Sequence, residues 1–130
     1  MNYIIMDLEA TCIQTHWTIG GKMIQASKSF QNEIIEIGAV KINDSNDKLE
    51  IIDEFSAFIK PILNPELSDF CIQLTTITQD DINKALGFPL VLHDFREWLG
   101  NDYVYYALGV YMIKTNSKEI ANYIILKLAG

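Results

Sequence analysis

Two acidic residues, Asp7 and Glu9, lie one residue apart in an otherwise apolar run near the start of the sequence, Tyr3-Ile4-Ile5-Met6-Asp7-Leu8-Glu9-Ala10-Thr11. Alternate side chains of a β-strand share a face, so a strand here would place both carboxylates on one side and apolar side chains on the other. Carboxylate oxygens are ligands for Mg²⁺, and a bound cation offsets the repulsion between two like charges. The pair therefore predicts a magnesium site. The alternative is a strand end whose acids only face water.

Strands and helices that could position this pair follow along the chain, with no repeat, low-complexity stretch or linker. The segment 14–31 holds Gly20 and Gly21 and is expected to be a loop over the strand end. The apolar runs 33–42 and 51–60 are separated by a turn-forming cluster at 43–47, so they predict an antiparallel hairpin.

The second half of the sequence predicts two helices and one further strand. Thr78-Gln79-Asp80-Asp81 has the form of a capping box and begins a helix that runs to about Ala85. A second helix is expected to start near Pro89, where apolar residues recur at helical spacing. His93 lies on that helix and is interpreted as structural or solvated, because no neighbouring residue would orient it as a base. A strand is expected at 103–106.

Length and composition describe one globular domain. The 130 residues are 49% hydrophobic and 21% charged, which is ordinary for a chain that buries a core. No apolar run is long enough to span a bilayer and no signal peptide is recognisable, so a cytoplasmic protein is expected. Cys12 and Cys71 have neither metal-type spacing nor the density of a disulfide framework, and they are interpreted as reduced, buried thiols.

The net charge of −7 argues against broad electrostatic attraction to nucleic acid. It does not exclude a nuclease, because metal ions bound to carboxylates make an active site much less negative than its sequence suggests. Any binding to nucleic acid is expected to be short-ranged and confined to the site.

Four sequence blocks then carry a family resemblance. They are Asp7-Leu8-Glu9-Ala10-Thr11; Asn32-Glu33-Ile34-Ile35-Glu36-Ile37-Gly38-Ala39; Phe58-Ile59-Lys60-Pro61; and Leu67-Ser68-Asp69-Phe70-Cys71 with Leu74-Thr75-Thr76-Ile77-Thr78-Gln79. Their order over about residues 1–106 resembles the DEDDh 3′-to-5′ exonucleases. The resemblance is strongest to the branch that contains the exoribonucleases trimming histone mRNA and small RNA and the exonuclease-type sporulation-pathway inhibitor.

The resemblance implies an α/β, ribonuclease H-like fold, with a mixed five-stranded sheet flanked by helices and incomplete at the C-terminus. It implies that Asp7 and Glu9 are catalytic ligands of two divalent ions, Mg²⁺ or Mn²⁺, which activate water for phosphodiester hydrolysis. Ala10, Thr11 and Leu74 match positions that hold the terminal nucleotide, so the implied partner is the 3′ end of a single-stranded nucleic acid, with RNA favoured over DNA. For Leu74 and Phe70, plain core packing is an equal alternative.

Several family features are absent from this sequence. Thr76 stands where the family usually has glycine. Where the family reads Trp-Gly-x-x-Asp, the chain reads Leu108-Gly109-Val110-Tyr111-Met112, and no later histidine follows. A thioether is a poor ligand for a hard cation, so Met112 cannot take the place of the aspartate. Residues 1–106 are thus expected to form the N-terminal part of an exonuclease domain, followed by an atypical tail at 107–130.

A shift of reading frame would explain the tail. Met is always encoded ATG and Ile codons always begin AT, so the frame offset by one base across Met112-Ile113 must read GAT, an aspartate codon. With permissible codons the same frame yields Trp-Gly four residues earlier. We therefore hypothesise that the frame shifts near Tyr106 and that exonuclease activity is impaired. The alternative function is a non-catalytic acidic module that binds a protein partner or a nucleic-acid end.

Overall fold

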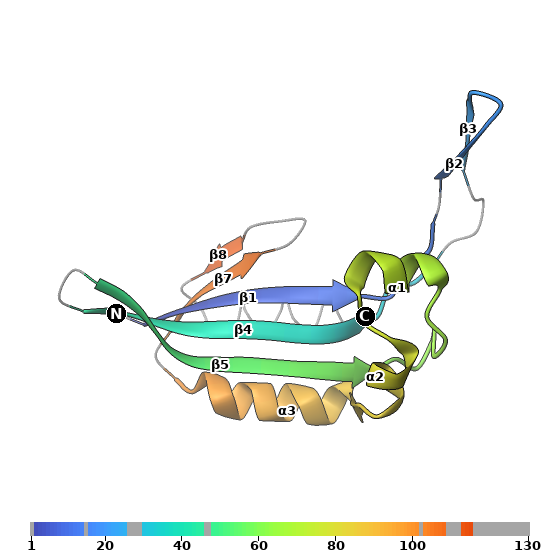
Figure 1. Ribbon diagram of the computed structural model, residues 1–130. Helices are drawn as coiled ribbons and strands as arrows, with labels where there is room; N and C mark the ends of the chain where they lie inside the picture. Colours follow the sequence, from blue (N-terminus) through green and yellow to red (C-terminus); the bar gives the residue numbers. More distant parts are fainter. Residues whose placement is uncertain are drawn as a thin grey trace.

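A computed structural model describes residues 2–14, 16–25, 30–45, 48–101, 103–108 and 113–115. Six strands form one mixed sheet in the order β6-β5-β4-β1-β7-β8, and β2 and β3 form a separate two-stranded sheet (Figure 1). The strands are β1 (Asn2–Ala10), β2 (His16–Ile19), β3 (Lys22–Gln25), β4 (Ile34–Ser45), β5 (Lys48–Lys60), β6 (Leu86–Gly87), β7 (Val104–Leu108) and β8 (Ile113–Thr115); the helices are α1 (Asp69–Thr75), α2 (Gln79–Asn83) and α3 (Phe88–Leu99).

The main sheet is mixed, as the resemblance implied. β1 lies between β4, with which it is antiparallel, and β7, with which it is parallel. β4 and β5 form the expected antiparallel hairpin. The described part of the sheet has six strands where the resemblance implied five, and one of them, β6, has only two residues.

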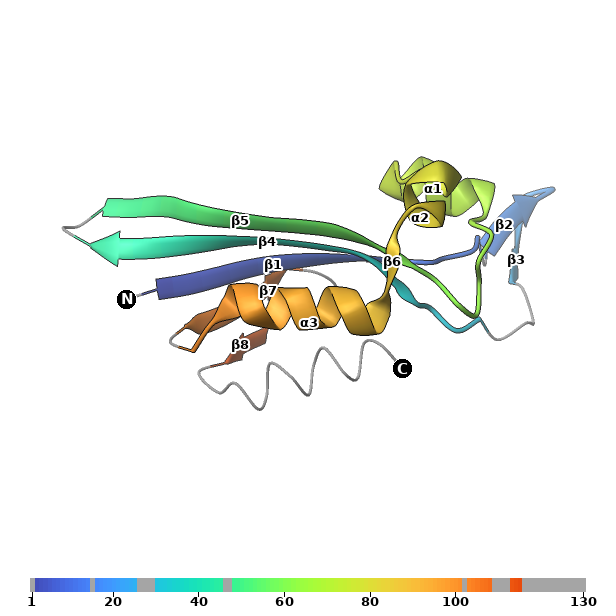
Figure 2. The ribbon, with the colours of Figure 1, turned by 90° about the horizontal axis from the view of Figure 1, so that it is seen from below.

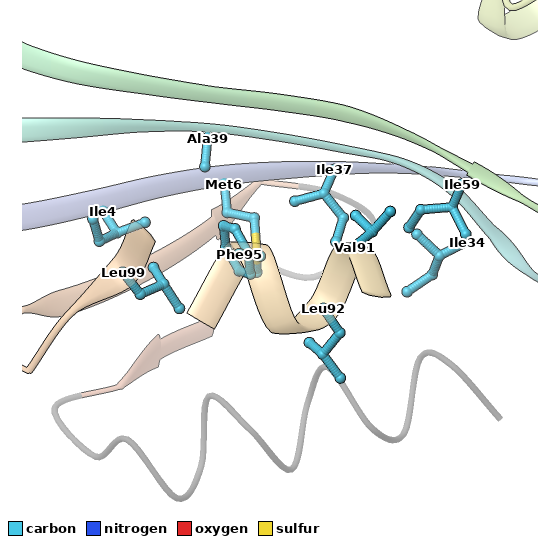
Figure 3. Packing of buried hydrophobic residues seen from close by; sticks show 10 residues of the cluster. All are labelled: Ile4, Met6, Ile34, Ile37, Ala39, Ile59, Val91, Leu92, Phe95 and Leu99. Carbon is cyan, nitrogen blue, oxygen red and sulfur yellow. The ribbon is translucent and has the colours of Figure 1, made fainter. Parts of the chain in front are cut away.

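One face of the sheet is covered by α3. This helix begins after Gly87 with a proline in its first turn, and it ends at Gly100, whose φ of 74° favours glycine. Its apolar residues recur at helical spacing and pack on β1, β4 and β5 (Figure 3). The buried cluster comprises Ile4, Met6, Ile34, Ile37, Ala39, Ile59, Val91, Leu92, Phe95 and Leu99. Burial of this face fixes which way every side chain of β1 points.

Helices α1 and α2 lie on the opposite side of the sheet from α3, at the end where β1 finishes (Figure 2). They enclose a second, smaller core of Ile35, Cys71, Ile77 and Ile82. The predicted capping box begins α2: the Thr78 hydroxyl accepts from the Asp81 N–H, and the Asp81 carboxylate accepts from the Thr78 N–H. None of the helices in the described part of the chain is long and apolar enough to cross a membrane.

The segment predicted as a loop over the strand end is instead a β-hairpin. β2 and β3 pair through residues 16–19 and 22–25, and Gly20 and Gly21 form the turn. Both glycines have positive φ, 58° and 78°, as a two-residue type I′ turn requires. The hairpin projects away from the main sheet beyond the end of β1 (Figure 1).

Candidate carboxylate site

Asp7 and Glu9 occupy the face of β1 that α3 does not cover. The intervening Ile4, Met6 and Leu8 pack toward α3, whereas Asp7 is exposed and Glu9 half-buried. The alternation predicted from the sequence therefore holds. Because the strand is central in the sheet and anchored by its apolar side chains, both carboxylates are held on a rigid support.

A third carboxylate, Glu36 of β4, lies directly across from Glu9. The pairing register joins Glu9 to Glu36 but Ala10 to Ile34, so Ile35 is an extra residue that forms a β-bulge. The bulge lets Ile35 enter the small core beneath α1 and α2, where it is fully buried. Glu36 then remains on the carboxylate face, a residue that sequence reasoning did not single out.

The three carboxylates repel one another. Burial, followed by the charge of Asp7, raises the pKa of Glu9. Burial also raises the pKa of Glu36, with further contributions from the charges of Glu9, Asp7 and Asp81. Among the residues that the structure describes, neither Asp7, Glu9 nor Glu36 forms an ion pair with lysine or arginine. A bound cation would offset this repulsion.

Space for a ligand lies beside Asp7. A shallow depression of about 370 Å³ runs over β1, β4 and β5 and includes Asp7, Gly38 and Ser56 in its lining. Gly38 is the cross-strand partner of Asp7, and a Cβ at that position would meet only the Asp7 backbone oxygen, at 3.9 Å. The absence of a side chain at Gly38 keeps the floor of the depression open.

Within the described ranges, no three His, Cys, Asp or Glu side chains converge closely enough to hold a metal ion. The parallel pairing of β1 and β7 sets Leu108, the last residue of β7, opposite Asp7. Met112, at the position where the family pattern has an aspartate, lies outside the described residues.

Helix α1 is fixed to the end of β1. Ser68 caps the helix by accepting from the Cys71 N–H at 3.0 Å, and its hydroxyl donates to the Cys12 carbonyl at 2.7 Å. Cys71 is fully buried and its thiol faces the Ala10 carbonyl at 3.7 Å. The helix is therefore held beside the strand that carries the two acids.

Phe70 and Leu74 lie on the part of α1 that is open to solvent. Leu74 is 65% exposed and Phe70 is 37% exposed. Core packing does not explain either residue, and the core position of this helix belongs to Cys71. The predicted contact of Leu74 with the terminal nucleotide stays a prediction.

Thr11 connects β1 to β4. Its hydroxyl accepts from the Glu33 N–H, its N–H donates to the Glu33 carbonyl, and its carbonyl accepts from the Asn32 amide. The residue is only 2% exposed. These bonds give Thr11 a clear structural role, and its predicted contact with a nucleotide stays a prediction. Ala10 is half-buried at the end of β1.

The carboxylate of Glu33 holds the segment after β5. Its two oxygens accept from the backbone N–H groups of Ile62, at 2.7 Å, and Asn64, at 2.6 Å. Burial alone would raise the pKa of Glu33, but backbone donors from Leu63, Ile62 and Asn64 outweigh it and lower the pKa. This acid is therefore a structural anchor and does not belong to the carboxylate face.

The remaining candidates lie elsewhere or are chemically inert. His93 is exposed on α3, which lies across the sheet from the acids (Figure 2). Cys12 and Cys71 are free thiols, and Cys71 is buried as expected whereas Cys12 is only half-buried. Burial, the neighbouring Cys71 thiol and the charge of Glu9 raise the pKa of Cys12 to about 12, which disfavours the nucleophilic thiolate.

Comparisons with known proteins agree on one family. The family model described as Exonuclease (RNase T) matches residues 4–125. The 3′-5′ exoribonuclease 1 of Homo sapiens is 39% identical over 109 residues, which cover 80% of this chain and 28% of the human protein. The 3′-5′ exonuclease eri1 of Schizosaccharomyces pombe is 40% identical over 91 residues, 70% of this chain and 27% of the yeast protein. The chain thus spans less than a third of the length of these relatives.

Solved structures show the same likeness. The nuclease domain of 3′hExo, a DEDDh family member bound to rAMP, matches with a TM-score of 0.70 and 33% identity, over 99% of this chain and 60% of that one. A 3′-exonuclease solved for its 3′-end specific recognition of the histone mRNA stem-loop matches with a TM-score of 0.66 and 34% identity, over 84% of this chain and 36% of that one.

The fold is therefore the ribonuclease H-like fold of the DEDDh exonucleases, which generally depend on divalent metal ions. The relatives named above are exonucleases. By its sequence blocks, its sheet and its carboxylate pair, this chain belongs to the Exonuclease (RNase T) family.

Proposed function

We propose that this chain carries the N-terminal part of a 3′-to-5′ exonuclease site that hydrolyses phosphodiester bonds at the 3′ end of RNA. The observation that carries the proposal is the pair Asp7 and Glu9. Both carboxylates stand on one face of the central strand, Glu36 adds negative charge opposite Glu9, and a depression opens beside them. RNA is the proposed substrate because the similar proteins are 3′-5′ exoribonucleases.

The donor set fits a hard divalent cation, and we propose Mg²⁺ or Mn²⁺. Asp7 and Glu9 offer oxygen ligands, the kind these ions prefer. When bound, two such ions supply an activated water and stabilise charge on the leaving 3′ oxygen. The other parts of the chain bind and position the substrate: Phe70 and Leu74 pack against the terminal nucleoside, and Gly38 leaves room for the phosphate beside Asp7.

Activity of the chain as written is expected to be weak. β7 ends opposite Asp7, and a third carboxylate is expected just after that strand. The sequence there has Met112, whose thioether does not bind Mg²⁺ well. An engineered Met112→Asp chain should therefore bind the metal more tightly than the original and should degrade RNA faster.

The first test measures metal binding by thermal unfolding with and without MnCl₂. An ion at ten times its Kd stabilises a protein by about 1.4 kcal/mol, which raises Tm by roughly 5 °C for a chain of this length. We expect Asp7→Asn and Glu9→Gln to remove most of this shift. Glu50→Gln is the matched control, because Glu50 is an exposed acid near the start of β5. Equal losses in all three variants would contradict a site at Asp7 and Glu9.

The second test measures the reaction itself. A single-stranded RNA with a 5′ label is incubated with the full chain and MgCl₂ or MnCl₂, and the products are separated by length. A ladder that shortens from the 3′ end, and that disappears with Asp7→Asn, supports the proposal. If Met112→Asp improves metal binding but neither the original chain nor this variant shortens RNA, the exonuclease assignment is wrong for this polypeptide.

A further inference from the structure

The β2–β3 hairpin emerges directly from the strand that carries the carboxylates. β1 ends at Ala10, the chain is pinned at Thr11, and β2 begins at His16. Figure 1 shows the hairpin projecting from the same end of the molecule at which β1 meets α1. From that position, we propose that it is a nucleic-acid-binding arm that contacts the sugar-phosphate backbone upstream of the 3′ end. This inference rests on the proposed function and specifies how that site would hold its substrate.

The arm exposes an apolar side chain on each of its faces. Ile19 pairs with Lys22 on one face and is 65% exposed, while Met23 pairs with Thr18 on the other and is 76% exposed. A two-stranded hairpin is at best marginally stable alone in water, because it needs a further strand or a helix against which to bury its side chains. Apolar side chains exposed on both faces of such an element indicate a surface that becomes covered when a partner binds.

The tip of the arm has a defined shape. Gly20 and Gly21 adopt the positive φ values of a type I′ turn, which matches the natural twist of the two strands. A Cβ at either glycine would meet no atom within 4 Å, so the turn stands in open solvent. The glycines are therefore required by the backbone conformation, and the tip presents Lys22 in a fixed place next to the turn.

The charge of the arm is opposite to that of the rest of the chain. Between Glu9 and Glu33 the sequence has no acidic residue, although the chain has 17 in all, and this stretch contains Lys22 and Lys28. Lys22 is exposed. A polyanion is repelled by a surface with net charge −7 and finds its favourable contacts where acids are missing. The combination of a lysine with exposed apolar side chains suits single-stranded nucleic acid, which is bound through its phosphates and by packing against its bases.

The test measures binding to a fluorescent single-stranded RNA of about 15 nucleotides, by anisotropy, with the full chain in EDTA so that the RNA stays intact. Lys22→Glu should weaken binding roughly threefold to tenfold at low salt, and the slope of log K against log salt should become about 0.7 less steep. Lys22→Arg should bind like the original. Lys48→Glu is the control for charge alone, because Lys48 is exposed at the start of β5, at the far end of the sheet (Figure 1).

Three outcomes would overturn the proposal: no effect of Lys22→Glu, an equal effect of Lys48→Glu, or self-association through the arm. The last would appear in sedimentation as a dimer that Ile19→Ser with Met23→Ser dissociates while RNA affinity stays unchanged. Hydrolysis of an aryl ester of a single nucleotide with MnCl₂ separates this proposal from the proposed function. That small substrate cannot reach the arm, so its failure to react would count against the catalytic site alone.

Discussion

Replacing Thr76 by glycine should stabilise the protein by about 1 kcal/mol. Thr76 ends α1 in the left-handed region, with φ 63° and ψ 5°, and its N–H donates to the Ile72 carbonyl. It is the one residue other than glycine with positive φ in the described part of the chain. A β-branched side chain is especially unfavourable there, because its Cβ substituents crowd the backbone.

The magnitude follows from two opposing terms. The left-handed conformation costs an L-residue about 1–2 kcal/mol, and glycine gives back about 0.5–1 kcal/mol because its unfolded chain is more flexible. Thr76 is exposed, so its removal costs little packing. The balance lies between about 0 and 1.5 kcal/mol, and a gain of about 1 kcal/mol corresponds to roughly 4 °C in Tm for 130 residues.

Thermal and urea unfolding followed by circular dichroism measure this gain. Thr76→Ala is a useful second variant. Alanine keeps the Cβ, so it should recover only the part of the gain in stability that comes from removing the β-branch. Thr75→Gly is the opposite control: Thr75 donates to the Cys71 carbonyl and accepts from the Ile77 N–H, so its loss should destabilise. If Thr76→Gly unfolded at a lower temperature than the original chain, the argument from backbone strain would be wrong.

Four further predictions concern the acids, the depression beside Asp7 and the coding DNA. Glu33→Gln should lower the free energy of unfolding by about 1.5–3 kcal/mol, the range for hydrogen bonds to a charged group. Because folding lowers the pKa of Glu33, the original chain should lose this stability as pH falls through the folded pKa. Urea titrations at several pH values check both points. Glu36→Gln should raise stability at neutral pH. Folding raises the pKa of Glu36, so the protonated carboxyl favours the folded state at low pH, and this stabilisation is lost as pH rises through the folded pKa. The same variant should weaken Mn²⁺ binding in the thermal-shift assay. Gly38→Val should leave the fold intact by circular dichroism but fill the depression, so RNA binding should fall while Gly38→Ala has a smaller effect. Sequencing the coding DNA beyond the Tyr106 codon should reveal an offset frame that continues to a histidine and an aspartate; early closure of that frame would contradict the frameshift hypothesis.

The elements that the sequence predicted well are those whose pattern has a local cause. The alternation in β1 is visible because α3 buries one face, and the capping box at Thr78 and the apolar spacing in α3 are signals within a few residues of each other. The same alternation allowed Asp7 and Glu9 to be assigned to one face of the strand. The predicted strand at 103–106 is confirmed by β7.

Helix α1, the β2–β3 hairpin and the role of Glu36 were not predicted. They depend on contacts elsewhere in the molecule, or on sequence patterns of only a few residues. Helix α1 has only seven residues and no full apolar period, although Ser68 followed by Asp69 was a usable start signal. Gly20-Gly21 between short strands was likewise a usable hairpin signal. The position of Glu36 opposite Glu9 depends on the register in which β1 pairs with β4, and a register between two strands cannot be read from either strand alone.

The parallel pairing of Tyr3 with Val104 has a consequence for how the protein is made. β1 leaves the ribosome first, yet one of its two neighbours is synthesised roughly a hundred residues later, which takes on the order of 5–20 s during translation. Until then, one edge of the central strand has unpaired N–H and C=O groups beside an apolar surface, the kind of edge that templates aggregation. The strand that holds the carboxylates is thus the last to be enclosed. Expression yield should therefore depend on chaperones and on the speed of translation through β7.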